Sequence, residues 1–245
     1  MKLNPTLRRW LLALCVLPLA TSVLAQEAVI RKTLAERLPQ LAKIDEVTRS
    51  PIAGLWEVRY GGTEILYTDD KGEFVFVNGS MVDTKTRVDL TEARIEKLLA
   101  VDFDKLPLKD AIVVKQGNGA RKLAVFEDPN CGYCKRFERD LATLKDVTVY
   151  TFLLPILGPD SVAKSRDIWC AKDNVKAWRG WMVDNQLPPK AGACDASALD
   201  RNLAFSRIHR INGTPALIFE DGTRKPGALP AAAVEQLLVA ATAKK

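Results

Sequence analysis

Two cysteines separated by two residues lie in the segment 126–137, which reads FEDPNCGYCKRF. Cys131 and Cys134 follow a predicted strand and begin a predicted helix. Such a pair can be a redox-active dithiol, a structural bridge or half of a zinc site. The choice among these three chemistries depends on the rest of the chain.

The predicted position of Cys131 favours redox chemistry. A thiolate at the start of a helix lies against free backbone N–H groups and the positive end of the helix dipole. Helix N-termini and C-x-x-C motifs lower the pKa of a thiol from about 8.5 to roughly 3.5–7.5. We therefore expect Cys131 to attack disulfides and the more buried Cys134, one turn into the helix, to resolve the products. Lys135 and Arg136 either add positive charge near the thiolate or form a solvated face.

The N-terminus indicates export. Residues 1–9 are basic, residues 10–20 (WLLALCVLPLA) are apolar, and small or apolar residues stand at 23 and 25. We interpret residues 1–25 as a cleavable signal peptide. A membrane anchor is the alternative, but a span needs about 20 apolar residues. A lipoprotein signal fits less well, because Leu14 precedes Cys15 where a small residue is expected.

Cleavage would leave 33 Lys and Arg against 30 Asp and Glu, a net charge too small to indicate nucleic-acid binding. It would also leave four cysteines, an even count that favours disulfides in an exported protein. Zinc or another metal is not expected, because the chain has one C-x-x-C pair and one histidine, His209.

Sequence alone allows three pairings of the four cysteines. A bridge between Cys131 and Cys134 closes a very short loop and would stabilise the fold little. A bridge between Cys170 and Cys194 closes a loop of 25 residues, and loops near that size gain about 3 kcal/mol in the chain-entropy description. We interpret the second pair as structural. The nearby Trp169, Trp178 and Trp181 are expected to belong to the core.

Residues 26–88 form a first predicted domain with a helix at 28–38 followed by short strands. A hairpin is expected across Gly61-Gly62 and another across Asn78-Gly79, since Asn-Gly is a strong hairpin signal. So small a unit has exposed strand edges, which are candidate dimer seams. A monomeric α+β domain is the alternative. Residues 89–109 are predicted to be a linker helix and arm, with Pro107 ending the helix.

Residues 110–245 follow a mixed strand and helix pattern, typical of a sheet covered on both sides. Two strands are expected across the turn at 117–119, and the helical stretches 161–172 and 174–186 are interpreted as an insertion. The remaining expected elements are a helix from Cys134, a strand at 147–154, a helix at 196–210, strands on either side of Asp221-Gly222 and a helix at 230–243.

A further feature is the segment NGTPALIF (212–219), which places Thr214-Pro215 directly before a strand. Strand, CGYC and helix, followed about 80 residues later by Gly-Thr-Pro before a strand, resemble the thioredoxin fold. The chain from the signal peptide to the Thr-Pro loop resembles the DsbC/DsbG family of periplasmic thiol:disulfide interchange proteins. That resemblance implies a small N-terminal α+β (cystatin-like) dimerisation domain, a linker helix and a C-terminal thioredoxin-like domain with a helical insertion.

The resemblance also implies a function. The protein would be a periplasmic homodimer that rearranges non-native disulfides in misfolded exported proteins, with possible chaperone activity and no cofactor. Cys131 and Cys134 would be catalytic, and Gly132, Tyr133, Thr214 and a cis Pro215 would form the active-site loops. A membrane thiol reductase of the DsbD type would keep the pair reduced. The alternatives are a monomeric thiol-disulfide oxidase or reductase on the same fold, and a non-catalytic holdase.

One departure concerns proton transfer. Position 125, six residues before Cys131, is valine where thioredoxin keeps a buried acid. Glu127 and Asp128 are nearer to the cysteines, but as residues at a strand end they are expected to be solvated. Proton transfer by a buried acid at the position that thioredoxin uses is therefore not expected.

Overall fold

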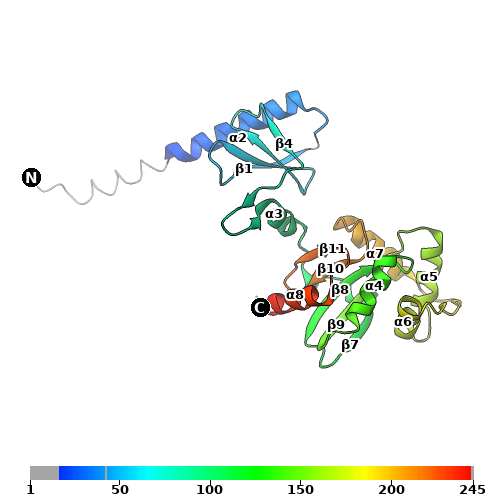
Figure 1. Ribbon diagram of the computed structural model, residues 1–245. Coiled ribbons are helices and arrows are strands. Elements are labelled where there is room, and N and C mark those ends of the chain that lie inside the picture. Colours follow the sequence, from blue (N-terminus) through cyan, green and yellow to red (C-terminus); the bar gives the residue numbers. More distant parts are fainter. Residues whose placement is uncertain (1–16, 42, 244–245) are drawn as a thin grey trace, which may run out of the picture. The chain divides into compact units, whose positions relative to one another are not determined.

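The computed structural model describes residues 17–41 and 43–243. The chain divides between Leu98 and Leu99 into two compact units (Figure 1). This division falls inside the segment 89–109, for which the sequence predicts a linker. Residues 1–16 of the expected signal peptide lie outside the described residues. Residues 17–25 belong to the first helix.

The N-terminal unit packs helix α2 (Leu17–Arg37) against a four-stranded antiparallel sheet in the order β1-β2-β3-β4. Ile30 and Leu34 of the helix meet Val58 and Leu66 of the sheet in one hydrophobic core. The strands are β1 (Ile44–Arg49), β2 (Leu55–Tyr60), β3 (Glu64–Asp69) and β4 (Val75–Val77).

One of the two predicted hairpins of this unit is confirmed and the other is wrong. β2 and β3 pair across Gly61 and Gly62, which both have positive φ. The Asn78-Gly79 hairpin does not form: β4 pairs with β3, while β5 (Val82–Asp83) pairs with β6 (Val88–Asp89). A two-residue turn of the expected type needs positive φ at both positions, and Gly79 does not adopt it.

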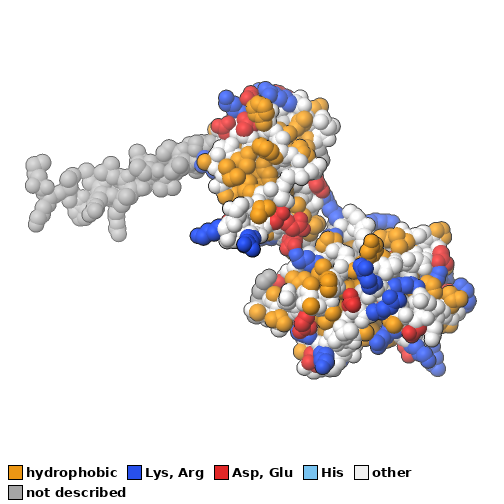
Figure 2. All heavy atoms as spheres, in the orientation of Figure 1, with side chains coloured by type: hydrophobic (Ala, Val, Ile, Leu, Met, Phe, Trp, Pro, Cys, Tyr) orange, Lys and Arg blue, Asp and Glu red, His pale blue; other side chains and the backbone are white. Residues whose placement is uncertain are grey.

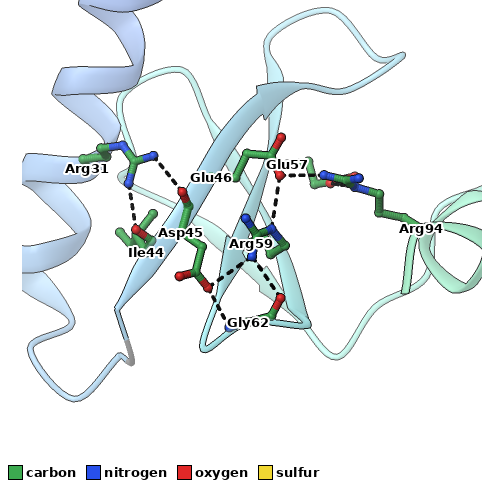
Figure 3. A network of polar contacts seen from close by, with 8 residues as sticks. All are labelled: Arg31, Ile44, Asp45, Glu46, Glu57, Arg59, Gly62 and Arg94. Carbon is green, nitrogen blue, oxygen red and sulfur yellow. Dashed lines mark hydrogen bonds and ion pairs between the residues drawn. The ribbon is translucent and has the colours of Figure 1, made fainter. Parts of the chain in front are cut away.

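Helix α3 (Leu90–Leu99) is attached to the same sheet by ion pairs (Figure 3). The Arg94 guanidinium lies 2.6 Å from a carboxylate oxygen of Glu46 on β1 and 3.2 Å from one of Glu57 on β2. Arg59 also pairs with Glu46, at 3.1 Å. These pairs, together with the Tyr67 hydroxyl 2.6 Å from Thr91 Oγ1, make α3 part of the N-terminal unit.

The C-terminal unit is built on a five-stranded mixed sheet in the order β11-β10-β8-β9-β7. β8 and β9 are parallel and the other pairs are antiparallel. Its strands are β7 (Ile112–Gln116), β8 (Arg121–Glu127), β9 (Val147–Leu153), β10 (Ala216–Phe219) and β11 (Arg224–Pro226).

β7 and β8 follow each other in the chain across the predicted turn, but they do not pair with each other, because β9 lies between them. The backbone N–H of Asn118 in the turn donates to Asp146, one residue before β9, at 2.9 Å. The turn therefore carries the chain past β9 instead of closing a hairpin.

Helices cover both faces of this sheet, as the sequence predicts. Leu123 and Val125 of β8 pack against α4 and α8, whereas Ala124 and Phe126 face the opposite core with α7. β8 is thus buried on both faces. The helices are α4 (Gly132–Leu141), α5 (Pro159–Trp169), α6 (Asn174–Asp184), α7 (Ser197–Ile208) and α8 (Ala231–Ala243).

Candidate active site

The cysteine pair lies where the central strand β8 turns into helix α4. Cys131 is the N-cap residue of α4, and its Sγ accepts a hydrogen bond from the backbone N–H of Cys134 at 3.4 Å. Both cysteines are free thiols. The Sγ of Cys131 therefore contacts the backbone at the N-terminal end of the helix.

The Thr-Pro loop meets this sulfur from another part of the chain. The Thr214–Pro215 peptide bond is cis, and the thiol of Cys131 donates to the Thr214 carbonyl at 3.3 Å. Pro215 directly precedes β10, which pairs with β8 and places Ala216 opposite Phe126. The sheet thus brings together two segments about 80 residues apart in the sequence.

Asp128 anchors the loop that leads to Cys131. Its carboxylate accepts hydrogen bonds from the backbone N–H groups of Asn130, Ile156 and Leu157 at 2.8–2.9 Å, and from the Ser161 hydroxyl at 2.7 Å. The prediction that Asp128 is solvated is wrong, since the residue is 0% exposed. The segment after β9 folds over the strand end, and its donors replace water around the carboxylate.

The corresponding prediction for Glu127 is also wrong, for a different reason. Glu127 is the last residue of a strand buried on both faces, and it is 0% exposed beneath α4. Neither of its carboxyl oxygens accepts a hydrogen bond from a donor with ordinary geometry among the described residues. Burial raises the pKa of Glu127 well above its ordinary value, and the negative charge of Glu138 raises it further.

Cys134 lies deeper than Cys131 and has no exposed surface. Burial raises the pKa of the Cys134 thiol strongly, and the neighbouring Glu127 adds to the effect. The thiol therefore stays protonated at neutral pH unless a base removes its proton.

Trp181 of α6 connects the insertion to the loop that precedes Cys131. Its indole N–H donates to the Pro129 carbonyl at 2.6 Å. The Lys135 ammonium lies 3.7 Å from the centre of its ring and donates to Asn185. Lys135 thus packs against the insertion, and burial followed by the charge of Lys164 lowers its pKa. Arg136 lies over the exposed ring of Tyr133, which the resemblance predicts to be an active-site loop residue.

The sequence does not predict that three residues belong to this site: Glu138, Trp181 and the buried Glu127. A signal for Glu138 was present, because it falls four residues after Cys134 on the helix face that also carries Phe137 and Leu141. An acid on that apolar face is unusual. A signal for Glu127 was the apolar run that continues to its strand end.

Cys170 and Cys194 form a disulfide that closes the insertion around α6. Because a loop of this length gains about 3 kcal/mol from cross-linking, we expect the Cys170→Ala, Cys194→Ala double variant to lose roughly that free energy of unfolding. Urea denaturation of the oxidised proteins measures it. Wild type treated with enough reductant to open this bridge is the control and should match the variant. Equal stability of wild type and variant would contradict a structural role.

Among the described residues, no group of three or more His, Cys, Asp and Glu side chains is arranged to hold a metal ion. The same part of the chain contains no helix long and apolar enough to cross a membrane.

Comparison with known proteins gives two family matches. Residues 108–242 match the thioredoxin-like domain family and residues 21–92 match the disulfide bond isomerase protein N-terminal domain. These matches confirm the predicted fold class.

Individual relatives agree with the family matches. The probable thiol:disulfide interchange protein DsbC of Bordetella pertussis is 48% identical over 205 residues, covering 84% of this chain and 71% of the relative. Thiol:disulfide interchange protein DsbC of Escherichia coli K12 is 29% identical over 218 residues, covering 87% and 88%. The crystal structure of a disulfide interchange protein from Neisseria gonorrhoeae superposes with a TM-score of 0.53 at 36% identity, covering 55% of this chain and 97% of that one.

Proposed function

Because the chain belongs to the DsbC family of thiol:disulfide interchange proteins, we propose that Cys131 and Cys134 are the redox-active pair with which it rearranges non-native disulfides in exported proteins. The family makes the chain a thiol-disulfide oxidoreductase of the isomerase type. The observation that carries the assignment of the site is the position of the Cys131 Sγ, between the N-terminus of α4 and the Thr214 carbonyl.

In the proposed reaction the Cys131 thiolate attacks one sulfur of a wrong substrate disulfide. The substrate S–S bond breaks, one substrate sulfur leaves as a thiolate, and the other is held in a mixed disulfide with Cys131. A different substrate thiolate then attacks the substrate sulfur of this bond and releases Cys131. Electrons balance without an external oxidant, because one disulfide is exchanged for another.

Cys134 provides a second exit. Its thiolate attacks the Cys131 sulfur of a stalled mixed disulfide, which forms the Cys131–Cys134 disulfide and releases the substrate with two reduced thiols. The pair is then oxidised and needs a dithiol reductant, for which we propose a membrane thiol reductase of the DsbD type. In this proposal Gly132 and Tyr133 form the active-site loop between the two cysteines, and Thr214 and Pro215 lie beside Cys131 and offer backbone groups to an extended substrate segment.

The test is reactivation of a scrambled, multi-disulfide protein by the reduced mature chain without added oxidant. Catalytic return of the substrate's activity supports isomerase chemistry. Reduction of the substrate without rearrangement would contradict it and would favour the reductase alternative. Suppressed aggregation with no disulfide exchange would instead favour the holdase alternative.

We also propose that the protein acts as a periplasmic homodimer joined through its N-terminal unit. Figure 2 shows exposed hydrophobic side chains gathered over this unit. β4 is an edge strand of the described sheet, and the Phe76 side chain on it is 62% exposed. Phe74 and Val77 beside it are exposed as well. Pairing β4 with a second copy would satisfy its free edge and bury these side chains.

Replacing Phe76 with aspartate should therefore dissociate the dimer. Loss of a buried aromatic anchor at an interface costs about 2 kcal/mol or more, which corresponds to roughly 30-fold weaker association. Light scattering over a concentration series measures it. Val113→Asp is the matched control, since Val113 is an exposed apolar residue on β7, an edge strand of the other unit. Equal association of both variants would contradict this interface.

A further inference from the structure

The buried position of Cys134 poses a chemical problem that the family assignment does not solve. To attack the mixed disulfide, Cys134 must lose a proton, yet its side chain has no exposed surface and burial favours the neutral thiol. Water reaches such a sulfur poorly, so the proton needs an acceptor inside the protein.

Glu127 occupies the position of that acceptor. Its carboxyl group interacts with the Cys134 side chain and with the Glu138 side chain. Because neither of its oxygens accepts a bond from an ordinary donor among the described residues, the carboxylate has no structural partner of its own. An isolated buried carboxylate is costly to maintain and gains stability by taking up a proton.

Glu138 extends this contact toward the surface. It lies one turn after Cys134 on α4, keeps a small exposed fraction of 9%, and accepts a hydrogen bond from the Trp178 indole N–H at 2.9 Å. It also lines a small hollow together with Gln116, Thr151 and Arg179. The Trp178 bond holds one oxygen in place and leaves the other free to face a second group.

Building on the function proposed for the cysteine pair, we propose that Glu127 and Glu138 form a proton relay between the buried Cys134 thiol and solvent. When Cys134 attacks Cys131 in the mixed disulfide, the S–H proton moves to the Glu127 carboxylate and the new S–S bond forms. The substrate sulfur leaves as a thiolate. Glu127 passes the proton through Glu138 to water at the hollow. When a dithiol later reduces the pair, the same groups return a proton to Cys134.

The charged and titratable groups around the relay fix its response to pH. Cys131 and Cys134 at the start of α4, and Glu138 on the same helix, interact with Glu127. Arg179 on α6 lines the hollow at the outer end. The negative charge of Glu138 raises the pKa of Glu127. Removing that charge must therefore shift the ionisation of Glu127 to lower pH.

The experiment follows a reduced protein mixed with an aromatic disulfide that releases a coloured thiolate. The first release reports attack by Cys131, and the second reports attack by Cys134 on the resulting mixed disulfide. In Glu127→Gln we expect an unchanged first phase and a second phase about 100-fold slower at neutral pH, the lower end of typical general-base contributions. In Glu138→Gln the pH midpoint of the second phase should move down.

Glu220→Gln is the matched control. The Glu220 side chain is also largely buried in this sheet region, at 6% exposed, but it pairs with Lys122, and its variant should leave both phases unchanged. If Glu127→Gln keeps its second phase within about 3-fold of wild type, the relay is wrong although the proposed function stands. If wild type shows no fast first phase, the proposed function fails and the relay fails with it. Glu127→Leu, which also lacks a base, must reproduce the slow second phase; a normal rate there would overturn the relay.

Discussion

Replacing Cys131 with serine is expected to abolish disulfide rearrangement, whereas replacing Cys134 with serine should leave much of it intact. A serine hydroxyl cannot form a mixed disulfide, so the first variant loses the covalent step entirely. The expected loss is at least about 1,000-fold, in line with removal of other covalent nucleophiles. Rearrangement itself ends when a substrate thiol displaces Cys131, and that route does not use Cys134.

The two variants separate the roles of the thiols in a single assay. Reactivation of a scrambled substrate should be undetectable with Cys131→Ser and substantial with Cys134→Ser, which should also accumulate mixed disulfides visible by non-reducing electrophoresis. A Cys131→Ser protein that rearranges disulfides as fast as wild type would contradict the assignment of Cys131 as the nucleophile. Equal loss in both variants would mean that the enzyme works by cycles of reduction and reoxidation, in which both thiols are needed.

The sequence predicts the helices, most strands and the cysteine pair because their signals are local. Apolar periodicity defines β8 and β9, and glycine pairs mark the β2–β3 turn. Strand pairing is less local. The Asn78-Gly79 hairpin fails because Gly79 does not adopt the positive φ that the turn needs, and β5 pairs instead with β6, which comes later in the chain. The sequence also does not show that β9 lies between β7 and β8, because β9 comes later in the chain.

The burial of the acids beside the cysteines depends on tertiary structure. Glu127 and Asp128 are neighbours at a strand end, and both are fully buried, yet they have opposite surroundings. Asp128 receives four hydrogen bonds from segments 130 and 156–161, whereas Glu127 faces Glu138 and Cys134. The periodicity of two along a strand sends successive side chains to opposite sides. Only the fold shows that donors lie on one side and acids and thiols on the other.

This difference has a thermodynamic consequence. Holding a carboxyl group buried without donors costs stability, and natural proteins keep such costs mainly where function requires them. Asp128 accepts four hydrogen bonds that stabilise the loop before Cys131, so its carboxyl group is part of the structure. Glu127 contributes no comparable bond, and its neutral form is the one that the surroundings favour. The burial of Glu127 is therefore explained better by a function than by a contribution to stability.

Replacing Glu127 with glutamine should stabilise the C-terminal unit, and the gain in free energy of unfolding should grow with pH. The folded-state pKa of Glu127 lies above its unfolded value of about 4.3. Between those two values the unfolded chain has lost the proton that the folded protein still holds, so the stability of wild type falls as pH rises. The slope for one group is at most about 1.4 kcal/mol per pH unit. Glutamine has no proton to lose and removes this dependence.

Urea denaturation at a series of pH values measures the effect, with Cys131 and Cys134 held as a disulfide so that neither thiol titrates. Trp178, which is buried in the C-terminal unit, reports the unfolding of that unit. The difference between Glu127→Gln and wild type should be small near pH 4, rise through neutral pH and level off above the folded-state pKa. Glu220→Gln, which loses an ion pair with Lys122, should gain no stability at any pH. A Glu127→Gln protein less stable than wild type at neutral pH would show that the carboxylate is a structural element after all, because only a carboxylate held by favourable contacts costs stability when it is removed.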